Sequence, residues 1–390
     1  MSGNRRRELR NFLIVGATGR NAGKTEFACS VIRRLSERHE VVGLKVSTIY
    51  STTRGCLRGR DGCGVCTSVA GKFDLSEETT AGSGKDTQRL LAAGARRVYW
   101  LRVKEPYLGE ALAHVAELLD PDVPVVCESN GLRRVVEPGL FVMLHPEPMG
   151  TIKPSARAVL SRADRLVRFD GRTFHPDPDR VTFESGSFRL RHDATAVVLA
   201  GGRSARMGRN KAMLDVGGGP MIEQIVRMLQ SMFDEVMVSV AGGEPYGFLG
   251  VPLVTDRVSN AGPLAGILSG LEAASHDSCL FVACDIPEVS PRFVNRLMRQ
   301  ADRHDAVVPR YADGRIEPVC AVYRKSLLPA IHEVFDNGGR KIREAYAGAN
   351  VYYLPVDEDE SIANLNTPDE YRAYVNGRCE PGGHGFMRML

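Results

Sequence analysis

The sequence predicts two three-layer α/β domains joined by a linker, and three observations support this fold class. At 390 residues the chain exceeds the usual size of one domain. Short β-rich segments alternate with amphipathic helical stretches, which is typical of parallel sheets with helices on both faces. A glycine-rich loop follows the first predicted strand of each half, once just before residue 24 and again near residue 200.

The composition is that of an ordinary globular protein, with 43% hydrophobic and 25% charged residues. The net charge of +4 is small and scattered, which argues against nucleic-acid binding but leaves anionic small molecules as partners. No apolar run approaches the roughly 20 residues that a membrane-spanning helix needs. The apolar run after the basic N-terminus leads straight into a glycine loop and indicates a strand rather than a signal peptide. We therefore expect a cytoplasmic protein.

The first predicted domain covers residues 1–170, and its strands are short runs rich in β-branched and aromatic residues. A cysteine-bearing insertion at 51–82 interrupts the alternation of strands and helices. A polar segment at 171–193 follows, and we interpret it as a linker with one hairpin. The expected strands are 11–17, 41–47, 96–103, 123–129, 140–144 and 165–169.

The second predicted domain covers residues 194–376, and a short tail, 377–390, follows it. No repeat period relates the two halves, so we expect two different α/β domains. The apolar runs of this half again end in glycine or in an acidic residue. The expected strands are 194–202, 234–243, 251–256, 278–285, 306–311 and 317–324.

The first glycine loop, IVGATGRNAGKTEF at 14–27, lies between a predicted strand and a predicted helix. Such a loop surrounds a phosphate with backbone N–H groups at the positive end of the helix dipole. Lys24 is expected to reach the β- and γ-phosphates, and Thr25 to hold Mg²⁺. The usual spacing would place the first glycine where this chain has Thr18, so the loop is a variant. The expected nucleotide contacts are Gly19, Ala22, Gly23, Lys24, Thr25 and Glu128.

Glu128 ends an apolar strand, where an acidic residue can position water or Mg²⁺ beside a phosphate loop. Together with the GKT at 23–25 and the GKDT at 84–87, it resembles the MobB-type adaptor GTPase of molybdopterin-guanine dinucleotide synthesis. The resemblance implies a P-loop NTPase fold, GTP binding and a weak GTPase activity. Neighbouring P-loop families with a similar acidic strand end, such as the dethiobiotin synthetase type, stay open as alternatives.

The insertion contains three cysteines, Cys56, Cys63 and Cys66, in the spacing C-x6-C-x2-C. In a cytosolic chain, clustered cysteines favour metal or redox chemistry over disulfides. Thiolates two residues apart on a glycine turn can bind one ion, and the third cysteine can close on it. We expect an Fe–S cluster or Zn²⁺ here, with the fourth ligand open. Three unrelated surface thiols are the alternative.

The second glycine loop, LAGGRSARMGRNKAML at 199–214, follows the first predicted strand of the second half. Its glycines let the backbone approach a nucleotide, and Arg206 and Lys211 supply positive charge for its phosphates. This spacing resembles the nucleotidyltransferases that attach a nucleoside monophosphate to a phosphorylated acceptor.

Within that superfamily, residues 195–374 resemble the MobA-type molybdenum cofactor guanylyltransferases, which implies a Rossmann-like nucleotidyltransferase fold. The motifs are VTD before GPLAG, LFVACDIPEVS, and NLNTPDEY. Two features depart from the family: Glu317 stands where a histidine is common, and 241–244 offers no asparagine for the nucleoside. The resemblance implies nucleotide contacts at Leu199, Ala200, Gly201, Gly202, Lys211, Asp256 and Asp285, a Mg²⁺ ligand in Asp285, catalytic charges on Arg206, Lys211 and Asp285, and acceptor contacts at Asn364 and Asn366.

The implied reaction transfers GMP from GTP to Mo-molybdopterin, giving molybdopterin guanine dinucleotide and pyrophosphate. Because this reaction brings two anions together, it depends on positioning and charge neutralisation by Mg²⁺ and basic side chains. The expected small-molecule partners are GTP and the molybdopterin cofactor. Molybdoenzymes and an upstream molybdenum-insertion protein are the expected protein partners, and a homodimer is left open.

Three alternatives are weighed against this function. The cytidylyltransferase of the same cofactor commonly has L-A-A-G where this chain has Gly201 as the third residue, and the missing methyl group favours a purine. A sugar-nucleotide or other nucleotidyltransferase would need an acceptor signature that the sequence does not contain. A non-catalytic P-loop GTP-binding or cofactor-carrier module is disfavoured by the presence of Lys211 and Asp285.

Overall fold

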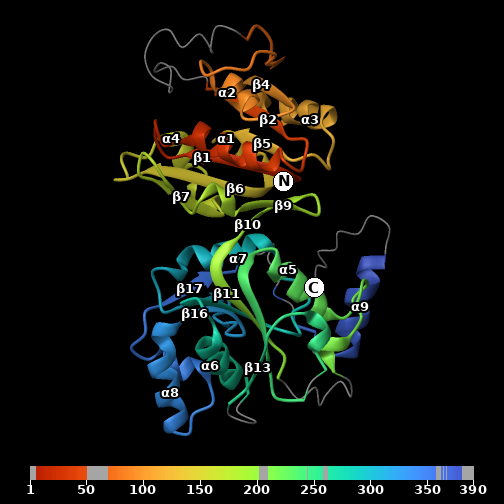
Figure 1. The fold of residues 1–390 in the computed structure, drawn as a ribbon, viewed down its shortest axis with the longest axis vertical. Coiled ribbons are helices and arrows are strands. Elements are labelled where there is room, and N and C mark those ends of the chain that lie inside the picture. Colours follow the sequence, from red (N-terminus) through yellow and green to blue (C-terminus); the bar gives the residue numbers. More distant parts are fainter. Residues whose placement is uncertain are drawn as a thin grey trace. The chain divides into compact units, whose positions relative to one another are not determined.

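The computed structural model describes residues 6–50, 69–201, 210–243, 245–257, 262–356, 362, 364–365 and 367–379. The chain divides into two compact units, Met1–Leu190 and Arg191–Leu390, each with its own sheet and hydrophobic cores (Figure 1). The division falls inside the segment 171–193 that the sequence suggests as a linker. Within the described ranges, no helix is both long and apolar enough to cross a membrane.

The first unit is built on one eight-stranded sheet. Its strands are β1 (Arg7–Ala17), β2 (Val42–Ile49), β3 (Phe73–Glu77), β4 (Arg97–Lys104), β5 (Val125–Glu128), β6 (Val136–Pro146), β7 (Arg165–Phe169) and β8 (Phe174–His175). They lie in the order β3-β4-β2-β5-β1-β6-β7-β8. The strands from β4 to β7 pair in parallel, and only the edge strands β3 and β8 are antiparallel to their neighbours.

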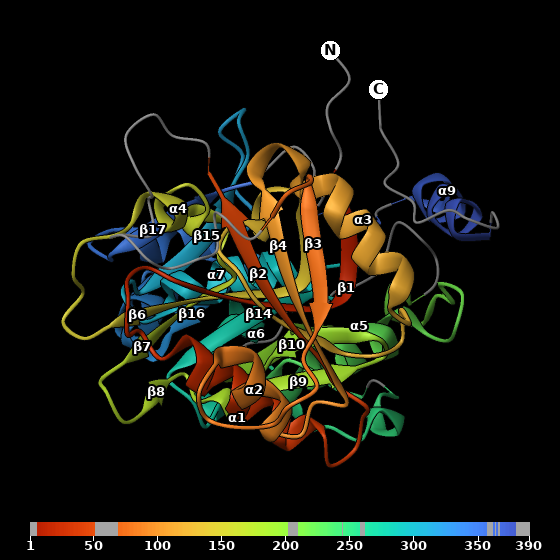
Figure 2. The ribbon, with the colours of Figure 1, turned by 90° about the horizontal axis from the view of Figure 1, so that it is seen from above.

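Helices cover both faces of this sheet. They are α1 (Lys24–Leu35), α2 (Asp86–Ala92), α3 (Leu108–Leu118) and the short α4 (Pro154–Arg157), with 3-10 turns η1 (Glu105–Tyr107), η2 (Leu132–Arg134) and η3 (Leu160–Arg162). Successive residues of β1 alternate between the two faces. Leu13 and Val15 join the core under α1 and α2, whereas Phe12 and Ile14 join the core under α3 (Figure 2).

The end of the first unit forms the hairpin that the sequence suggests. A 3-10 turn, η4 (Pro178–Arg180), leads into β9 (Val181–Glu184) and β10 (Ser187–Leu190), which pair antiparallel. Phe183 and Phe188 of this hairpin are buried and belong to the core under α1. The hairpin is therefore part of the first unit's packing.

The second unit is built on one seven-stranded sheet. Its strands are β11 (His192–Leu199), β12 (Phe233–Val240), β13 (Leu253–Thr255), β14 (Ser278–Ala283), β15 (Ala306–Arg310), β16 (Cys320–Arg324) and β17 (Val351–Pro355). They lie in the order β13-β12-β11-β14-β16-β15-β17. Only β16 runs antiparallel to its neighbours.

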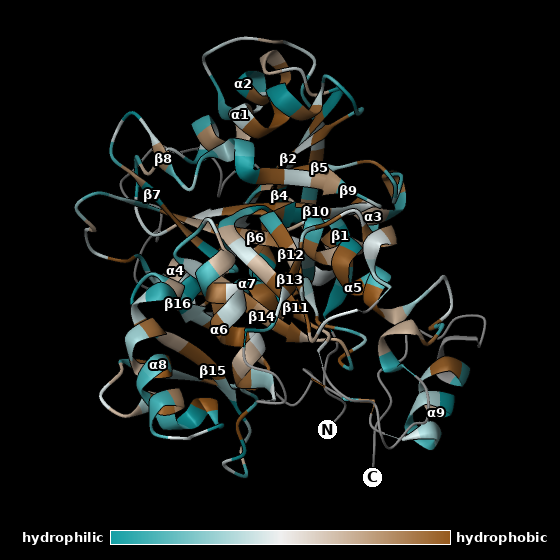
Figure 3. Ribbon diagram, turned by 60° about the horizontal axis from the view of Figure 1, so that its bottom comes forward, coloured by the Kyte–Doolittle hydropathy of each residue, from teal (hydrophilic) through white to brown (hydrophobic). Residues whose placement is uncertain are grey.

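Helices again cover both faces. They are α5 (Met221–Gln230), α6 (Pro263–Ala273), α7 (Pro291–Ala301), α8 (Leu328–Asp336) and α9 (Pro368–Cys379), with 3-10 turns η5 (Lys211–Met213), η6 (Gly247–Leu249), η7 (Lys325–Leu327) and η8 (Ile342–Tyr346). Ala196 and Val198 of β11 face the core under α5 and α7, and Val197 and Leu199 face the core under α6 and α8. Figure 3 shows the hydrophobic colours concentrated on the central strands. This three-layer packing is the α/β architecture that the alternating pattern predicts.

Candidate functional site

Four strands of the second unit end at the same edge of the sheet because β13, β12, β11 and β14 are mutually parallel. β11 lies between β12 and β14, so the chain turns in opposite directions on its two sides. In open α/β sheets, ligands bind outside the carboxyl ends of the strands at such a point. The residues that follow these strands include Gly201, Ala241, Asp256 and Asp285.

Lys211 and Asp285 meet at this edge although they belong to different segments. The Lys211 Nζ lies 3.6 Å from the Asp285 Oδ2, and the two side chains are 15% and 24% exposed. Lys211 opens η5, which Asn210 caps by accepting a hydrogen bond from the Ala212 N–H. Asn210 also donates to the hydroxyl of the buried Tyr246. The local fold thus holds the ammonium group of Lys211 beside the strand end that carries Asp285.

The segment before α9 contacts the same place. The Leu365 N–H donates to the Asp285 carbonyl oxygen at 2.8 Å. Asn364 hydrogen bonds to the Glu317 side chain, and the buried Oδ1 of Asn364 has no hydrogen-bond partner among the residues that the structure describes. Asn364 therefore lies beside Glu317, and the residue after it contacts the backbone of Asp285.

Glu317 is a site residue that the sequence flagged only as a departure from a family pattern. Burial, together with the nearby charge of Asp285, raises the pKa of the Glu317 carboxyl, while hydrogen bonds from the Val319 backbone and the Asn364 side chain oppose the rise. Glu317 adds a second carboxyl group beside Asp285. Its closeness to Asp285 depends on how the chain folds back after β15, which the spacing does not show.

Asp256 lies on the other side of the loop that begins at Gly201. Ser239, near the end of β12, donates from its hydroxyl to the Asp256 Oδ1 at 2.6 Å. A methyl group at Gly201 would lie 2.7 Å from the Asp256 Oδ2 and 3.0 Å from the Ala241 nitrogen. These distances are shorter than non-bonded contacts allow, so Gly201 is required by the packing of Asp256 itself.

Some predicted residues of this site lie outside the described residues. These are Gly202, Arg206 and Asn366. Leu199 and Ala200 are described and buried, so they would contact a ligand through their backbone. The structure thus brings Lys211, Asp285 and Asn364 together, with Asp256 at the neighbouring strand end.

Comparison with known proteins places this unit in a family. Residues 196–351 match the family described as "MobA-like NTP transferase domain". A protein of Pelotomaculum thermopropionicum named "Probable molybdenum cofactor guanylyltransferase" is 37% identical over 185 residues, which are 45% of this chain and 89% of the relative. The chain belongs to the MobA-like NTP transferase family.

Further relatives agree in extent. A "Probable molybdenum cofactor guanylyltransferase" of Carboxydothermus hydrogenoformans is 34% identical and covers 45% of this chain and 92% of its own length. A solved structure of molybdopterin-guanine dinucleotide biosynthesis protein A from Archaeoglobus fulgidus has 25% identity and a TM-score of 0.42, and covers 47% of this chain and 97% of its own. The MobA-like family match begins at residue 196, so the first unit lies outside it.

The glycine loop of that first unit connects β1 to α1. Gly23 caps α1 with φ 71°, in the left-handed region that favours glycine, and Asn21 is also left-handed at φ 54°. A methyl group at Gly23 would lie 2.9 Å from the rings of Phe169 and Phe174, which stack on each other. Gly23 is thus required both by its backbone angle and by close packing. The strand, loop and helix follow in the order that the sequence predicts.

Glu128 is the most unusual residue of this loop region. It ends β5 beside Val15 of β1 and is 1% exposed. Neither of its carboxylate oxygens has a hydrogen-bond partner among the described residues. A buried carboxylate without partners is costly, because no water or donor replaces its hydration. The positive charge of Lys24 is close by: burial and Glu128 raise the pKa of the Cys127 thiol, and Lys24 opposes that rise.

Some of the other residues predicted for this unit are described by the structure, and the three clustered cysteines are not. Ala22 of the loop and Thr25 of α1 are 3% and 7% exposed, and the half-buried Gly19 accepts a hydrogen bond from Lys153 through its carbonyl oxygen. Asp86, in the GKDT segment, forms an ion pair with Lys45 of β2. Cys56, Cys63 and Cys66 lie outside the described residues, so the predicted thiolate site stays a prediction.

Proposed function

We propose that the second unit is a molybdenum cofactor guanylyltransferase that transfers GMP from GTP to Mo-molybdopterin. The observation that carries the proposal is the pairing of Lys211 with Asp285 at the ligand-binding edge of a sheet in a MobA-like family member. The names of the relatives support the choice of guanylyl transfer and of the acceptor.

The residues present fit a magnesium ion. Mg²⁺ prefers oxygen ligands, and Asp285, Glu317 and the Oδ1 of Asn364 bring such oxygens to one place, the last of them without a hydrogen-bond partner among the described residues. Asp285 would be the principal ligand. When bound, the ion would reduce the negative charge of the triphosphate.

The side chains of this unit would then act by charge and position. An oxygen of the acceptor phosphate bonds to the α-phosphorus of GTP, and the bond from that phosphorus to the bridging oxygen of pyrophosphate breaks. Lys211 would attract the phosphates, and Arg206 would add a second positive charge from the same loop. Since both reactants are anions, placing these cations before the reaction lowers the barrier. Asp256 would hold the nucleoside side of GTP beside the backbone at Gly201.

The test is the release of pyrophosphate from GTP by the full chain, with and without molybdopterin acceptor. We expect pyrophosphate release to depend on the acceptor, and GTP to be used well ahead of CTP and ATP. The Asp285→Asn variant should lose about a hundredfold to a thousandfold in turnover. Asp313→Asn is the matched control, since Asp313 is an exposed aspartate paired with Arg315. Equal use of CTP would favour the cytidylyltransferase alternative, and unchanged turnover in Asp285→Asn would contradict the assigned site.

For the first unit we propose a second GTP site, of the MobB-like adaptor type, with weak GTPase activity. The specific observation is the buried, unpartnered carboxylate of Glu128 beside the loop that carries Lys24 and Thr25. A magnesium ion held by Thr25 with a water on Glu128 would satisfy these oxygens. The dethiobiotin synthetase type of P-loop protein remains the alternative, because it also has an acidic strand end.

Lys24→Ala tests this second site in the full chain. Removing the phosphate-paired charge should weaken binding of a fluorescent GTP analogue to the first unit by at least about tenfold, measured in an Asp285→Asn, Lys211→Ala, Arg206→Ala background that removes the charges proposed to bind GTP in the second unit. Lys72→Ala is the control, because Lys72 is exposed and pairs with Glu110. Binding that is unaffected by Lys24→Ala would exclude the loop as a phosphate site.

We propose a cytoplasmic protein that delivers its product to molybdoenzymes and receives its substrate from an upstream molybdenum-insertion protein, as a monomer or homodimer. Cys56, Cys63 and Cys66 are proposed to bind an Fe–S cluster or Zn²⁺. Metal content after anaerobic purification, with Cys63 and Cys66 changed to Ser as the comparison, tests that part.

A further inference from the structure

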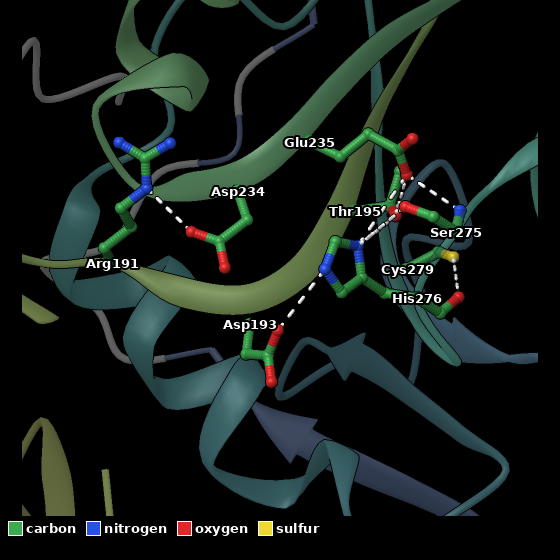
Figure 4. Close-up of polar contacts among 8 residues, drawn as sticks. All are labelled: Arg191, Asp193, Thr195, Asp234, Glu235, Ser275, His276 and Cys279. Carbon is green, nitrogen blue, oxygen red and sulfur yellow. Dashed lines mark hydrogen bonds and ion pairs between the residues drawn. The ribbon is translucent and has the colours of Figure 1, made fainter. Parts of the chain in front are cut away.

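A cluster of metal-ligating side chains lies at the opposite end of β11 from the candidate transfer site. Asp193, Asp234 and His276 each offer one ligand atom, and these atoms all lie within 4.8 Å of one another. They come from the starts of β11 and β12 and from the turn between α6 and β14. Figure 4 shows Asp193 and Asp234 on the side of the His276 ring that carries Nε2.

An irregularity in the sheet brings the two aspartates together. His192 of β11 pairs with Phe233 of β12, and Thr195 pairs with Glu235, so β11 has one more residue than β12 between these pairs. Such a β-bulge redirects the side chains beside it. Here it lies at Asp193 and opposite Asp234. Continued back from the Thr195–Glu235 pair, a regular ladder would put Ala194 beside Asp234 and Asp193 on the opposite face. The shifted register puts Asp193 beside Asp234 instead.

The second ring nitrogen of His276 is held by the protein. Its Nδ1 lies 3.1 Å from the Thr195 hydroxyl and 3.7 Å from the Glu235 Oε2. The Thr195 hydroxyl donates to Glu235, so its oxygen is left to accept from an Nδ1–H. With the proton on Nδ1, the lone pair of Nε2 points to Asp193, whose Oδ1 is 3.3 Å away. Histidine ligands of metals are usually oriented by a carboxylate or other acceptor in this way.

The geometry points to a binding site for a divalent transition-metal ion, with Zn²⁺ as the best match, formed by His276, Asp193 and Asp234. One imidazole and two carboxylates suit zinc better than Mg²⁺ or Ca²⁺, which prefer oxygen ligands throughout. Zinc ligands lie about 2.0–2.2 Å from the metal, so the side chains would close in by about 1 Å on binding. Asp193 is 75% exposed and can make this movement.

The proposed zinc site would stabilise the fold and take no part in the transfer reaction. Its ligands join the starts of two central strands to the turn before a third, so a bound ion would tie these segments together. A ligand that binds only the folded state raises stability by mass action. The Arg191 Nε contacts the Asp234 Oδ1 at 2.7 Å (Figure 4), and this ion pair would keep that carboxylate oriented beside the metal.

The test is Zn²⁺ binding by the full chain in a background with Cys56, Cys63 and Cys66 changed to Ser, which removes the thiolates of the other proposed site. Excess Mg²⁺ occupies the transfer site. Equilibrium dialysis followed by metal analysis should give one bound equivalent of Zn²⁺. His276→Gln and Asp193→Asn should each weaken this binding at least tenfold and abolish the rise in Tm that Zn²⁺ causes in the parent.

His332→Gln is the matched control, because His332 is a histidine of the same unit that pairs with Glu272 away from the cluster. It should bind Zn²⁺ like the parent. Asp193→Asn changes an exposed side chain, so it reports on binding even if His276→Gln fails to fold. A parent that binds no Zn²⁺, or Zn²⁺ binding that is equal in the parent and in both cluster variants, would overturn the site and leave His276 as a histidine that bridges carboxylates.

Discussion

At the scale of single residues, the structure gives a different reason for the glycine at position 201 than the sequence does. From the sequence, its missing methyl group suggests space for a purine base. In the structure, that methyl group would lie 2.7 Å from the Asp256 carboxylate. The residue therefore first makes room for Asp256, and its effect on the choice of base would follow only through the position of that aspartate.

Gly201→Ala tests the two explanations. Because the new methyl group must displace Asp256 or the end of β12, we expect higher KM values for GTP and CTP alike, by about tenfold, with little change in their ratio. Steady-state kinetics with both nucleotides measure this. A change in the ratio of the two KM values in favour of CTP would instead support the idea that Gly201 leaves room for a purine base.

The site residues also differ in how far the sequence could predict them. Asp285 follows an apolar strand and Lys211 belongs to the glycine loop after another, so both could be expected near one sheet edge, and in the structure their charged groups lie 3.6 Å apart. Glu317 and Asn364 depend on how the chain returns to that edge after β15 and β17, which no local pattern encodes. His276 could not be found at all, since its partners meet through a β-bulge that sequence does not reveal.

At the scale of helices and strands, the burial of the thiols has a chemical consequence. Cys29 lies in α1 and Cys279 in β14, and both face hydrophobic cores. Burial raises the pKa of Cys29 to about 11 and that of Cys279 to about 12. Only the thiolate reacts with alkylating reagents, so a raised pKa leaves about one molecule in a thousand or fewer reactive at pH 8.

We therefore expect iodoacetamide at pH 8 to leave Cys29 and Cys279 unlabelled in the native protein and to label both after denaturation. Because the folded pKa lies above the ordinary value, raising the pH toward 11 should increase native labelling of Cys29 before that of Cys279. Peptide mass spectrometry gives the extent at each residue. Rapid labelling of both at pH 8 would contradict the packing of α1 and β14 described above.

The strands were predicted best where they lie in the middle of a sheet. The buried parallel strands β2, β5 and β14 come from largely apolar runs, and their bounds agree with expectation to within two residues. β1 begins at Arg7 rather than 11, since its polar first residues still pair with β6. β3 and β17 were not expected: β3 is a half-polar edge strand, and β17 gains its partner only when it reaches β15. β16 begins at Cys320 rather than 317, and Pro318 just before it has no backbone N–H to donate to a strand ladder.

At the scale of the whole molecule, the two units have separate sheets and separate cores, and the division at Leu190/Arg191 cuts none of the helices or strands described. A domain with its own core can in principle fold alone. We therefore expect a fragment of residues 191–390 to fold and to retain guanylyl transfer within about threefold of the full chain at saturating substrate.

Circular dichroism and the pyrophosphate assay measure these two properties. A fragment that folds but has lost transfer would show that the first unit takes part in the reaction itself. Joined units would still raise each other's effective concentration for any substrate that passes between them, so a loss restricted to low acceptor concentration is compatible with independent folding.

The hydrogen bond from Leu365 to the Asp285 carbonyl has a consequence for the order in which the protein matures. Domains generally fold as units during synthesis, starting from the N-terminus. The first unit is complete once Leu190 has left the ribosome, whereas the edge that carries Asp285 is closed only when Leu365 has also emerged. A nascent chain would therefore complete the proposed nucleotide site of its first unit well before the proposed transfer site of its second.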